Sequence, residues 1–172
     1  MDVEIRLATE THIPAILDLY RKVAVIPKGI IRKPEEINLR YVSEFVHKSM
    51  DNGLILVASQ GKQVLGEIHA YTPQMYAFQH LLTDLTIVVD PQQQGKGIGK
   101  RLFTSFLKQV EEDFRHILRV ELYTRENNFK NVRFYEQMGF RNEGRQDRKI
   151  YAGKNQFETP LHMVWFNRQY VP

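Results

Sequence analysis

The 172-residue sequence contains no cysteine, only one tryptophan, and no uninterrupted apolar run long enough to cross a membrane. Without cysteine the chain can form neither disulfides nor cysteine–zinc sites, and it lacks a thiol for covalent catalysis. A transmembrane helix needs ~20 mostly apolar residues, so none is expected. The charged, alternating residues Asp2–Arg6 do not resemble a secretory signal. We therefore expect a cytoplasmic protein with no membrane partner.

The remaining composition is that of an ordinary globular protein. Hydrophobic residues make up 42% of the chain and charged residues 26%, and residues 1–172 are expected to form one domain. The net charge is +4 and the isoelectric point is about 9.3. An anionic ligand explains this balance at least as well as a nucleic acid does, because no block of like charges is present. No nucleic-acid partner is expected.

The most informative stretch joins a strand to a helix through a glycine-rich loop. The β-branched run Ile87–Val89 ends at Asp90–Pro91, and glycines follow at alternate positions, Gly95, Gly97 and Gly99. Glycine lets the backbone reach positive φ and approach a ligand closely. The first amides of the following helix lack intrahelical partners and lie at the positive end of its dipole. The stretch therefore predicts an anion cradle, typically for phosphate.

Two better-known phosphate loops do not fit this spacing. A P-loop has the pattern G-x-x-x-x-G-K-[ST]. Here Lys100 follows five residues after Gly95, and no second glycine stands before a lysine–serine or lysine–threonine pair. A dinucleotide fingerprint fails because Leu102 stands where the third glycine belongs. A glycine turn without any ligand remains an alternative, because short glycine motifs often occur by chance.

The loop does fit the motif [QR]-x-x-G-x-[GA], here Gln94–Gly99, and it resembles the GNAT superfamily of N-acetyltransferases. The stretch Asn128–Phe140 resembles the second signature of that family, N-x-x-a-x-x-[FL]-Y-x-x-x-G-F. Two signatures in this order are far more specific than either alone. The resemblance implies an α/β single-domain GNAT-like fold, with a mixed, mostly antiparallel sheet flanked by helices. It also implies acetyl-CoA as cosubstrate and no metal.

Hydrophobic periodicity predicts the element order β-α-α-β-β-β-α-β-α-β-β, which agrees with that fold. Strands are expected at residues 3–7, 54–58, 64–71, 82–89, 117–123, from 140 to a turn near 143–144, and at 161–166. Helices are expected after Thr9 or Thr11, from Pro34, from about Gly97 to Asp113, and after Asn127 or Asn128 to Met138. The segment 145–156 is polar and basic. On the strand at 64–71, Val64 is expected on the same face as Ile68, opposite Glu67 and His69.

The resemblance assigns cofactor contacts to three places. Backbone groups of Ile87, Val88 and Val89 would pair with the pantetheine arm as an added strand does. Amides of the loop would hold the pyrophosphate, from Gln94, Gly95, Lys96, Gly97, Ile98, Gly99 and Lys100. Asn128 and Asn131 would bond the cofactor from the short helix, although Asn128 fits a helix cap equally well. Lys130 and Arg133 are candidates for the 3′-phosphate, and a solvated helix face is the alternative for both.

Acetyl transfer to an amine needs a proton acceptor and a proton donor. A lysine-like amine has a pKa of ~10.4 in solution, so few molecules are neutral at pH 7 and a general base is expected. The candidate bases lie on the polar face of the two central strands, namely Glu67, His69, Asp84 and Thr86. Asp84 is the predicted base and Glu67 is the second candidate. A strand-start carboxylate without a catalytic role is the alternative for Asp84, and the absence of any side-chain base is a further alternative. Tyr135 occupies the family position of the acid that protonates the leaving thiolate. A core aromatic is the alternative for Tyr135.

The sequence thus predicts an acetyl-CoA-dependent N-acetyltransferase that acts by direct attack in a ternary complex. The acceptor would be a primary amine of a small molecule or peptide, and its class stays open among polyamines, amino acids, aminoglycosides and protein amino groups. Ile26, Ile30 and Ile31 suit one wall of the acceptor site. A non-catalytic acyl-CoA-binding sensor or partner domain is the alternative function. A homodimer is possible, because the last strands of this family often reach a partner subunit.

Overall fold

The computed structural model describes residues 2–172, which form one seven-stranded sheet, one two-stranded sheet and four α-helices. In chain order the elements are β1 (Glu4–Leu7), α1 (Ile13–Ala24), α2 (Leu39–Asn52), β2 (Gly53–Gln60), β3 (Gln63–Tyr71), β4 (Leu81–Val89), α3 (Ile98–Asp113), β5 (Arg119–Arg125), α4 (Phe129–Gln137), β6 (Arg141–Arg145), β7 (Ile150–Gly153), β8 (Gln156–Glu158) and β9 (Pro160–Phe166). Single 3₁₀ turns lie at Glu10–His12, Pro34–Glu36, Tyr76–Phe78 and Pro91–Gln93. The α/β fold class and the mostly antiparallel sheet are confirmed.

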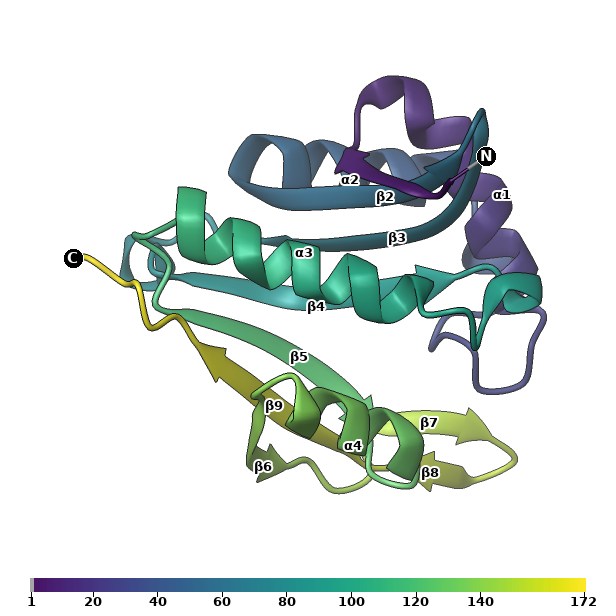
Figure 1. The fold of residues 1–172 in the computed structure, drawn as a ribbon. Helices are drawn as coiled ribbons and strands as arrows, with labels where there is room; N and C mark the ends of the chain where they lie inside the picture. The colour runs from purple at the N-terminus through teal and green to yellow at the C-terminus, as the bar shows by residue number, and fades with distance from the viewer. Residues whose placement is uncertain (1) are drawn as a thin grey trace.

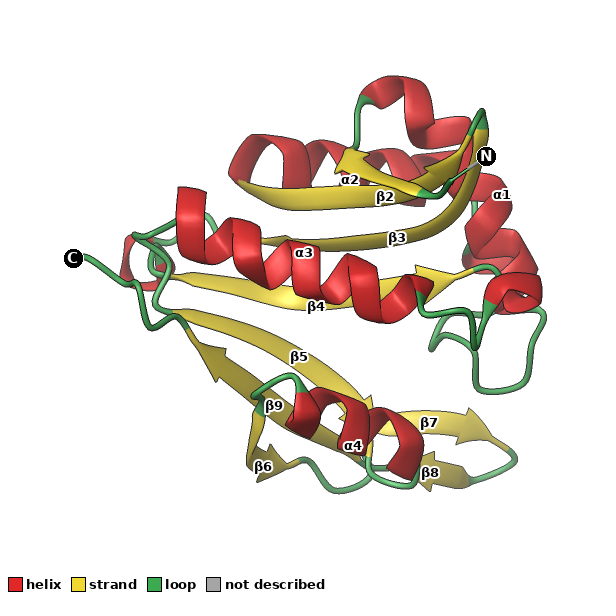
Figure 2. Cartoon of the chain, in the orientation of Figure 1, coloured by secondary structure: helices red, strands yellow, loops and turns green. Residues whose placement is uncertain are grey.

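The large sheet has the strand order β1-β2-β3-β4-β5-β9-β6. Every neighbouring pair is antiparallel except β4 and β5, which run parallel and are joined through α3. Figures 1 and 2 show α3 and α4 on one side of the sheet and α1 and α2 on the other. The sheet is therefore buried on both faces, which explains the nearly continuous burial along β2 and β3.

Two hydrophobic cores fill the two sides of the sheet. The larger core packs α3 residues such as Leu102, Phe103 and Phe106 against the sheet. The smaller core packs α1 and α2 against the other face of β2 and β3. A Cβ atom added to Gly66 of β3 would lie 2.7 Å from Leu102 Cδ1, so this glycine allows α3 to approach the sheet closely.

Two expectations for the first half of the chain are wrong. The second helix does not begin at Pro34, because Pro34–Glu36 forms a separate 3₁₀ turn and Ile37 is extended. The helix begins at Leu39, where the Asn38 side chain caps it by accepting the amide of Tyr41 at 3.0 Å. Val64 does not share the face of Ile68 but packs in the α1/α2 core. Ala58 lies opposite Gly66 and Ser59 opposite Val64, so β3 contains one extra residue at this point, and this bulge reverses the alternation.

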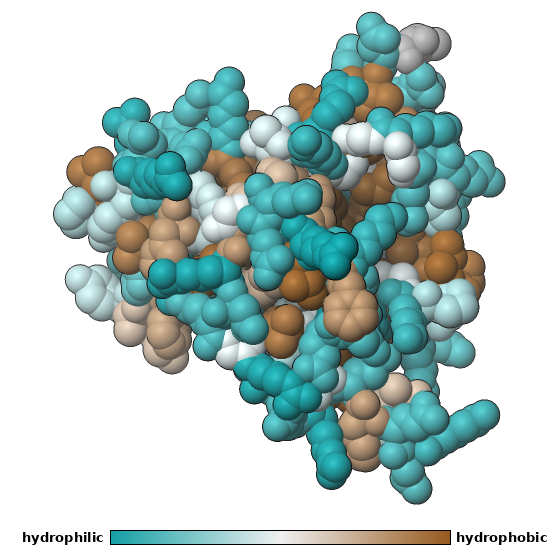
Figure 3. All heavy atoms as spheres, turned by 60° about the horizontal axis from the view of Figure 1, so that its bottom comes forward, coloured by the Kyte–Doolittle hydropathy of each residue, from teal (hydrophilic) through white to brown (hydrophobic). Residues whose placement is uncertain are grey.

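The C-terminal third contains a hairpin that the polar sequence did not predict. No turn occurs at Glu143–Gly144, because β6 runs through it with only a register shift. The polar segment instead folds into β7 and β8, which form their own two-stranded sheet. In Figure 3 the side with α4 and this hairpin is turned forward, and hydrophilic residues cover most of it. Apolar rings exposed among them include Phe129, Tyr151 and Phe157.

None of the helices found in residues 2–172 combines the length and the apolar character that a membrane span requires.

Candidate active site

The site is created where β4 and β5 separate. These strands pair at only two positions, beginning with Leu81 opposite Arg119, and β4 has no partner on that side afterwards. Asp84 adopts a φ of 53°, and the pairing of β3 with β4 changes register at the same level. This bulge turns β4 away from β5, as Figure 2 shows. The free edge of β4 keeps unpaired backbone groups that an extended ligand can use.

A cavity of about 630 Å³ opens between the separated strands. One wall is the free part of β4, including Leu85, Thr86 and Ile87, and the opposite wall is Tyr123–Arg125 of β5. Tyr135 of α4 reaches the cavity from a third side. The two strands therefore enclose a space that is bounded by backbone edges, aromatic rings and titratable side chains.

The glycine loop lies at the carboxyl end of β4, beside this cavity but not among the residues that line it. Gly95 and Gly97 have φ values of 80° and 81°, and Gly97 directly precedes α3. The first helical hydrogen bond runs from the Arg101 amide to Gly97 O at 3.0 Å. Within residues 2–172, the amides of Gly95–Lys100 find no backbone acceptor. These donors are available for the anion cradle that the sequence predicts.

The start of the loop is fixed by a buried carboxylate. Asp90 is 1% exposed; it accepts the Gln92 amide at 2.9 Å and the Lys22 ammonium at 2.9 Å. Burial alone would raise the pKa of Asp90, but the hydrogen bonds from Lys22 and Gln92 outweigh it and lower the pKa. The Lys96 ammonium donates one hydrogen bond to Gln93 Oε1 at 2.9 Å. Asp90 therefore ties the loop to α1.

The predicted pantetheine residues have different surroundings. Ile87 lines the cavity, whereas the Val88 side chain packs in the α1/α2 core and Val89 packs against the α3 core. A ligand in the cavity could therefore meet Val88 and Val89 only through their backbone, and Val89 O already accepts a hydrogen bond from Gln94 Nε2 at 3.5 Å. Leu85 and Thr86 also line the cavity; Thr86 was among the candidate bases, whereas the sequence analysis missed Leu85. Its place on the same strand was the available signal.

The short helix α4 brings its predicted residues to the cavity. Asn128, Asn131 and Tyr135 all line it. Asn128 also caps α4, since its Oδ1 accepts the Asn131 amide at 3.3 Å. Tyr135 is 8% exposed and packs on Phe103 with ring centroids 5.6 Å apart. Burial raises the pKa of Tyr135 to about 12, so the hydroxyl stays protonated at neutral pH. Both roles considered for Tyr135, acid and core aromatic, are thus compatible with its position.

Asp84 lies in the cavity, and its carboxylate accepts a short hydrogen bond from the Tyr71 hydroxyl. Burial, followed by this hydrogen bond and the charge of Asp84, raises the pKa of Tyr71. The Lys48 ammonium lies 3.6 Å from the centre of the Tyr71 ring. Asp84 is therefore held by neighbours, although its side chain remains exposed to solvent.

Behind this pair lies a group that the sequence analysis did not assemble. Glu67 is fully buried; its carboxylate accepts the Tyr20 hydroxyl at 2.7 Å and lies 2.9 Å from His69 Nδ1. His69 lines the cavity, whereas Glu67 does not. The period of β3 placed Glu67 and His69 on one face, but the partnership with Tyr20 depends on packing of α1 against the sheet. Glu67 is thus removed from any substrate by the His69 ring.

Loops and the β7–β8 hairpin form the remaining side of the cavity. Ile30 and Ile31 line the cavity as predicted, whereas Ile26 does not, and Ile150 of the hairpin adds a contact that was missed. Arg125 of β5 pairs with Glu158 of β8 and donates to Lys28 O at 3.2 Å. This arginine links the sheet, the hairpin and the α1–α2 connection into one wall.

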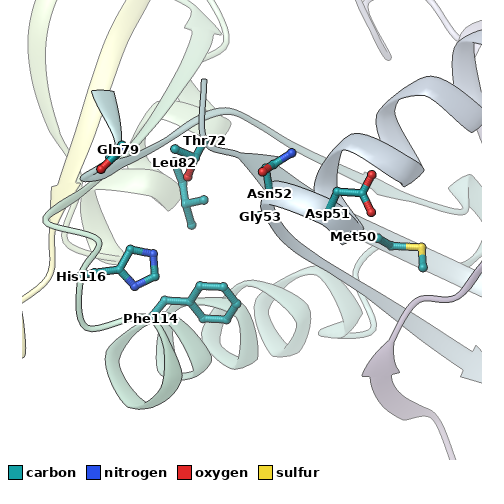
Figure 4. A pocket seen from close by; sticks show the side chains of 9 residues that line it. All are labelled: Met50, Asp51, Asn52, Gly53, Thr72, Gln79, Leu82, Phe114 and His116. Carbon is teal, nitrogen blue, oxygen red and sulfur yellow. The ribbon is translucent and has the colours of Figure 1, made fainter. Parts of the chain in front are cut away.

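A second cavity of about 480 Å³ lies at the opposite end of β4, near Leu82. Figure 4 shows its side chains, which come from the end of α2, the start of β4 and the segment after α3. It contains His116 and Asp51, but no ion pair joins them among the residues described. No glycine loop and no free strand edge adjoin it.

Comparison with known proteins shows the family and the fold of this chain. The family described as "Acetyltransferase (GNAT) domain" matches residues 51–142, a stretch from the end of α2 to β6 that includes the β4–β5 separation and the glycine loop. No curated protein sequence matches the chain. Solved structures match over nearly its whole length, and their identities are low enough that they show the fold alone.

Three of these structures illustrate the likeness. The protein yncA of Salmonella typhimurium, solved with its cofactor acetyl-CoA, has a TM-score of 0.85 at 15% identity, covering 100% of this chain and 98% of its own. A ribosomal-protein-alanine N-acetyltransferase of Brucella melitensis has a TM-score of 0.82 at 22% identity, covering 95% and 99%. A spermidine N-acetyltransferase SpeG chimera from Vibrio cholerae and hSSAT has a TM-score of 0.77 at 19% identity, covering 99% and 98%. Since the family matches more than half of the sequence, the chain belongs to the GNAT acetyltransferase domain family.

Proposed function

We propose that this protein transfers the acetyl group of acetyl-CoA to a primary amine by direct attack in a ternary complex. The observation that carries the proposal is the separation of β4 from β5, which leaves one strand edge unpaired beside a 630 Å³ cavity. The pantetheine arm contains amides and can add to that edge in the manner of a β-strand. The yncA structure, which has this fold, contains acetyl-CoA.

The glycine loop is the proposed pyrophosphate site. Its free amides, from Gly95 to Lys100, lie at the N-terminus of α3, a helix of 16 residues. Anions are favoured there by the donors and by the helix dipole. The loop lies at the carboxyl end of β4, so one extended cofactor can contact both the loop and the strand edge.

Tyr135 is the proposed acid that protonates the departing thiolate. It reaches the cavity between β4 and β5, and no side-chain hydrogen bond to its hydroxyl is found within residues 2–172. Its raised pKa keeps the hydroxyl protonated at neutral pH, so a proton is present in the cavity when the C–S bond breaks. Asn128 and Asn131, on the same helix face, would hold the cofactor near Tyr135.

The acceptor side suits an amine. Asp84 places a carboxylate in the cavity, which the aromatic residues Tyr41, Phe45 and Tyr71 also line. A carboxylate attracts an ammonium group, and aromatic faces add a cation–π contribution. The alanine amino group and spermidine named for two structural neighbours are therefore reasonable first acceptors to test.

Thermal melting with and without acetyl-CoA tests the cofactor, with NAD and ATP as controls. A ligand at 100 times its dissociation constant stabilises by ~2.7 kcal/mol, which should raise the melting temperature by roughly 5–10 °C. Release of free thiol in the presence of spermidine or an alanyl peptide then tests transfer. Binding of acetyl-CoA without release of free thiol in the presence of either amine would overturn the proposed enzymatic activity and leave an acyl-CoA-binding domain. An unchanged melting temperature in the presence of acetyl-CoA would overturn both the enzyme and the acyl-CoA-binding domain.

A further inference from the structure

A fully buried carboxylate without a cation beside it needs an explanation. Glu67 is 0% exposed, and no lysine or arginine pairs with it among the residues described. Its two oxygens are each used once, by the Tyr20 hydroxyl at 2.7 Å and by His69 Nδ1 at 2.9 Å. Burial and the Glu67 charge raise the pKa of Tyr20 well above its usual value, so Tyr20 stays a proton donor to this carboxylate.

The Glu67 carboxylate fixes which nitrogen of His69 carries the proton. An ionised carboxylate only accepts hydrogen bonds, so His69 must donate through Nδ1. In the neutral ring, Nε2 is then the basic atom. The ring cannot turn easily, because it stacks on Phe45 with centroids 4.3 Å apart and planes 10° from parallel.

The basic atom of His69 is available at the cavity. His69 is 4% exposed and lines the cavity that also contains Tyr135 and Thr86, and Thr86 is its partner across the β3–β4 pair. Within residues 2–172, Nε2 has no hydrogen-bond partner, and it is not among the buried unsatisfied atoms. A polar atom of this kind is positioned to meet a ligand.

Asp84 is a poorer proton acceptor by comparison. Its carboxylate already accepts the Tyr71 hydroxyl, and the Lys48 ammonium lies 3.6 Å from that ring. Carboxylates are ordinarily much weaker bases than imidazole, and general bases work best when their proton affinity matches neutral pH. Asp84 is better suited to attract the ammonium form of the substrate into the cavity.

We propose that His69 is the general base of acetyl transfer and that Glu67 and Tyr20 are positioning residues that hold its reactive tautomer. This inference rests on the proposed function and names its proton acceptor. The substrate ammonium first loses one proton to solvent. The neutral amine nitrogen then attacks the thioester carbonyl carbon and passes a second proton to His69 Nε2 as the N–C bond forms. The C–S bond then breaks, and the sulfur keeps the electron pair and takes the Tyr135 proton. Solvent removes the proton from His69 and restores that of Tyr135, leaving an amide and a free thiol.

The other titratable groups near His69 are of types that keep their charge over the pH range of the test described below. From the strands these are Glu67, Tyr71 and Asp84, and from α1, α2 and the loop between them they are Tyr20, Tyr41, Arg32 and Glu36. Imidazoles titrate between about pH 5 and 8, where none of these phenol, carboxylate or guanidinium types ordinarily changes charge. An inflection in that interval therefore reports an imidazole.

The experiment compares kcat/KM against pH for the wild type and for His69→Gln, His69→Ala, Glu67→Gln and Asp84→Asn, using spermidine and an alanyl peptide as acceptors. His116→Gln, in the second cavity, is the matched control. We expect an acid limb between pH 5 and 8 in the wild type, and the limb should stay in place when the acceptor is changed. We expect His69→Gln to lose the limb and ~10²–10⁴-fold in kcat/KM, with acetyl-CoA affinity unchanged. Added imidazole should restore part of the activity of His69→Ala.

Each outcome decides something different. Retention of the limb and of near wild-type kcat/KM in His69→Gln, with both lost in Asp84→Asn, would make Asp84 the base and overturn the proposal. Lack of imidazole rescue together with a lowered melting temperature would reduce His69 to a structural residue. Glu67→Gln is buried and can fail to fold, so the decision rests on the His69 variants. A wild type that binds acetyl-CoA but acetylates neither acceptor would overturn the proposed function itself, and this inference with it.

Discussion

The two ends of strand β4 have cavities of similar size but very different chemistry. The cavity at the separated end measures about 630 Å³, and the one at the paired end about 480 Å³. Near the paired end, β4 is hydrogen-bonded to strands on both sides, so its backbone has nothing left to offer a ligand. At the separated end, one edge of the same strand is free. Volume alone therefore does not distinguish a site, whereas unused backbone groups do.

The same difference appears in the side chains. The cavity at the separated end contains Asp84 and His69, each bonded to a further side chain, together with Tyr135. The cavity at the paired end contains His116 and Asp51 without an ion pair between them, as Figure 4 shows. Networks of buried polar groups are costly unless every member is satisfied, and such networks are common at reactive sites.

The largest effect is expected from the acid at the separated end. Tyr135→Phe removes one oxygen and keeps the packing on Phe103, so we expect kcat to fall ~10²–10⁴-fold while acetyl-CoA affinity changes little. Tyr76→Phe, at an exposed turn, is the matched control. Steady-state kinetics and calorimetric titration measure the two quantities. Unchanged kcat would mean that Tyr135 serves only the core.

The raised pKa of Tyr135 gives a related expectation for pH. Burial moves the pKa to about 12, so the acid form persists well into the alkaline range. The wild type should therefore show no loss of kcat from this tyrosine up to about pH 10, where an ordinary phenol would be half ionised. A profile of kcat at saturating substrates tests this. An alkaline loss that disappears in Tyr135→Phe would contradict the expected pKa.

The glycine loop should give the next largest effect. Gly97 has a φ of 81°, a conformation that β-branched residues rarely adopt, although a Cβ atom would meet nothing within 4 Å. We expect Gly97→Val to weaken acetyl-CoA binding ~10–100-fold, because the loop must change shape. Gly144→Val is the control, since Gly144 also has open space and lies in a strand. Equal affinities in the two variants would show that the loop shape is irrelevant.

A smaller effect on stability is expected from the tie between the loop and α1. The pKa of Asp90 is lowered in the folded state, so its contribution is present at neutral pH and is lost as the pH falls below about 4. We expect Asp90→Asn to lower the melting temperature by ~2–4 °C at pH 7, about 1 kcal/mol, because Lys22 is half exposed. Asp113→Asn is the surface control. A difference that persists unchanged at pH 3 would argue against the ion pair.

The smallest effect should come from the cavity at the paired end. His116→Gln changes a side chain that lines this cavity and contacts none of the residues proposed for transfer. We expect kcat/KM to stay within twofold of the wild type in the thiol-release assay. A tenfold loss would break the contrast between the two ends of β4 and would assign a role to the second cavity.

Much of the fold could be read from local patterns. The β-branched run at 87–89, the loop glycines and the apolar stripe of α3 correctly located the strand, loop and helix. Asn128 was correctly recognised as a possible cap of α4. The patterns failed at two places, where a single residue changes the face of a strand or the start of a helix. A bulge in β3 moved Val64 to the other face, and Asn38, rather than Pro34, begins α2.

The candidate site likewise has features that could be predicted from the sequence and features that could not. The glycine motif, the position of Tyr135 and the presence of Asp84 were accessible from the sequence, because each belongs to one contiguous segment. The Tyr20–Glu67–His69 group was not, because its members come from α1 and β3 and are brought together only when the helix packs on the sheet. Pairing across 47 positions in the chain leaves no periodic signal.

The sequence by itself therefore determined the family, through its resemblance to two family signatures. It also determined the strand, loop and helix around the glycines and the helix that presents Tyr135, since these follow from glycine spacing and from amphipathic periods within short segments. Only the tertiary structure decided that β4 turns away from β5 at Asp84, and that a buried carboxylate sets the tautomer of a cavity histidine. Both depend on how distant strands and helices compete for the same hydrogen-bonding groups, and that competition is resolved only when the chain has packed.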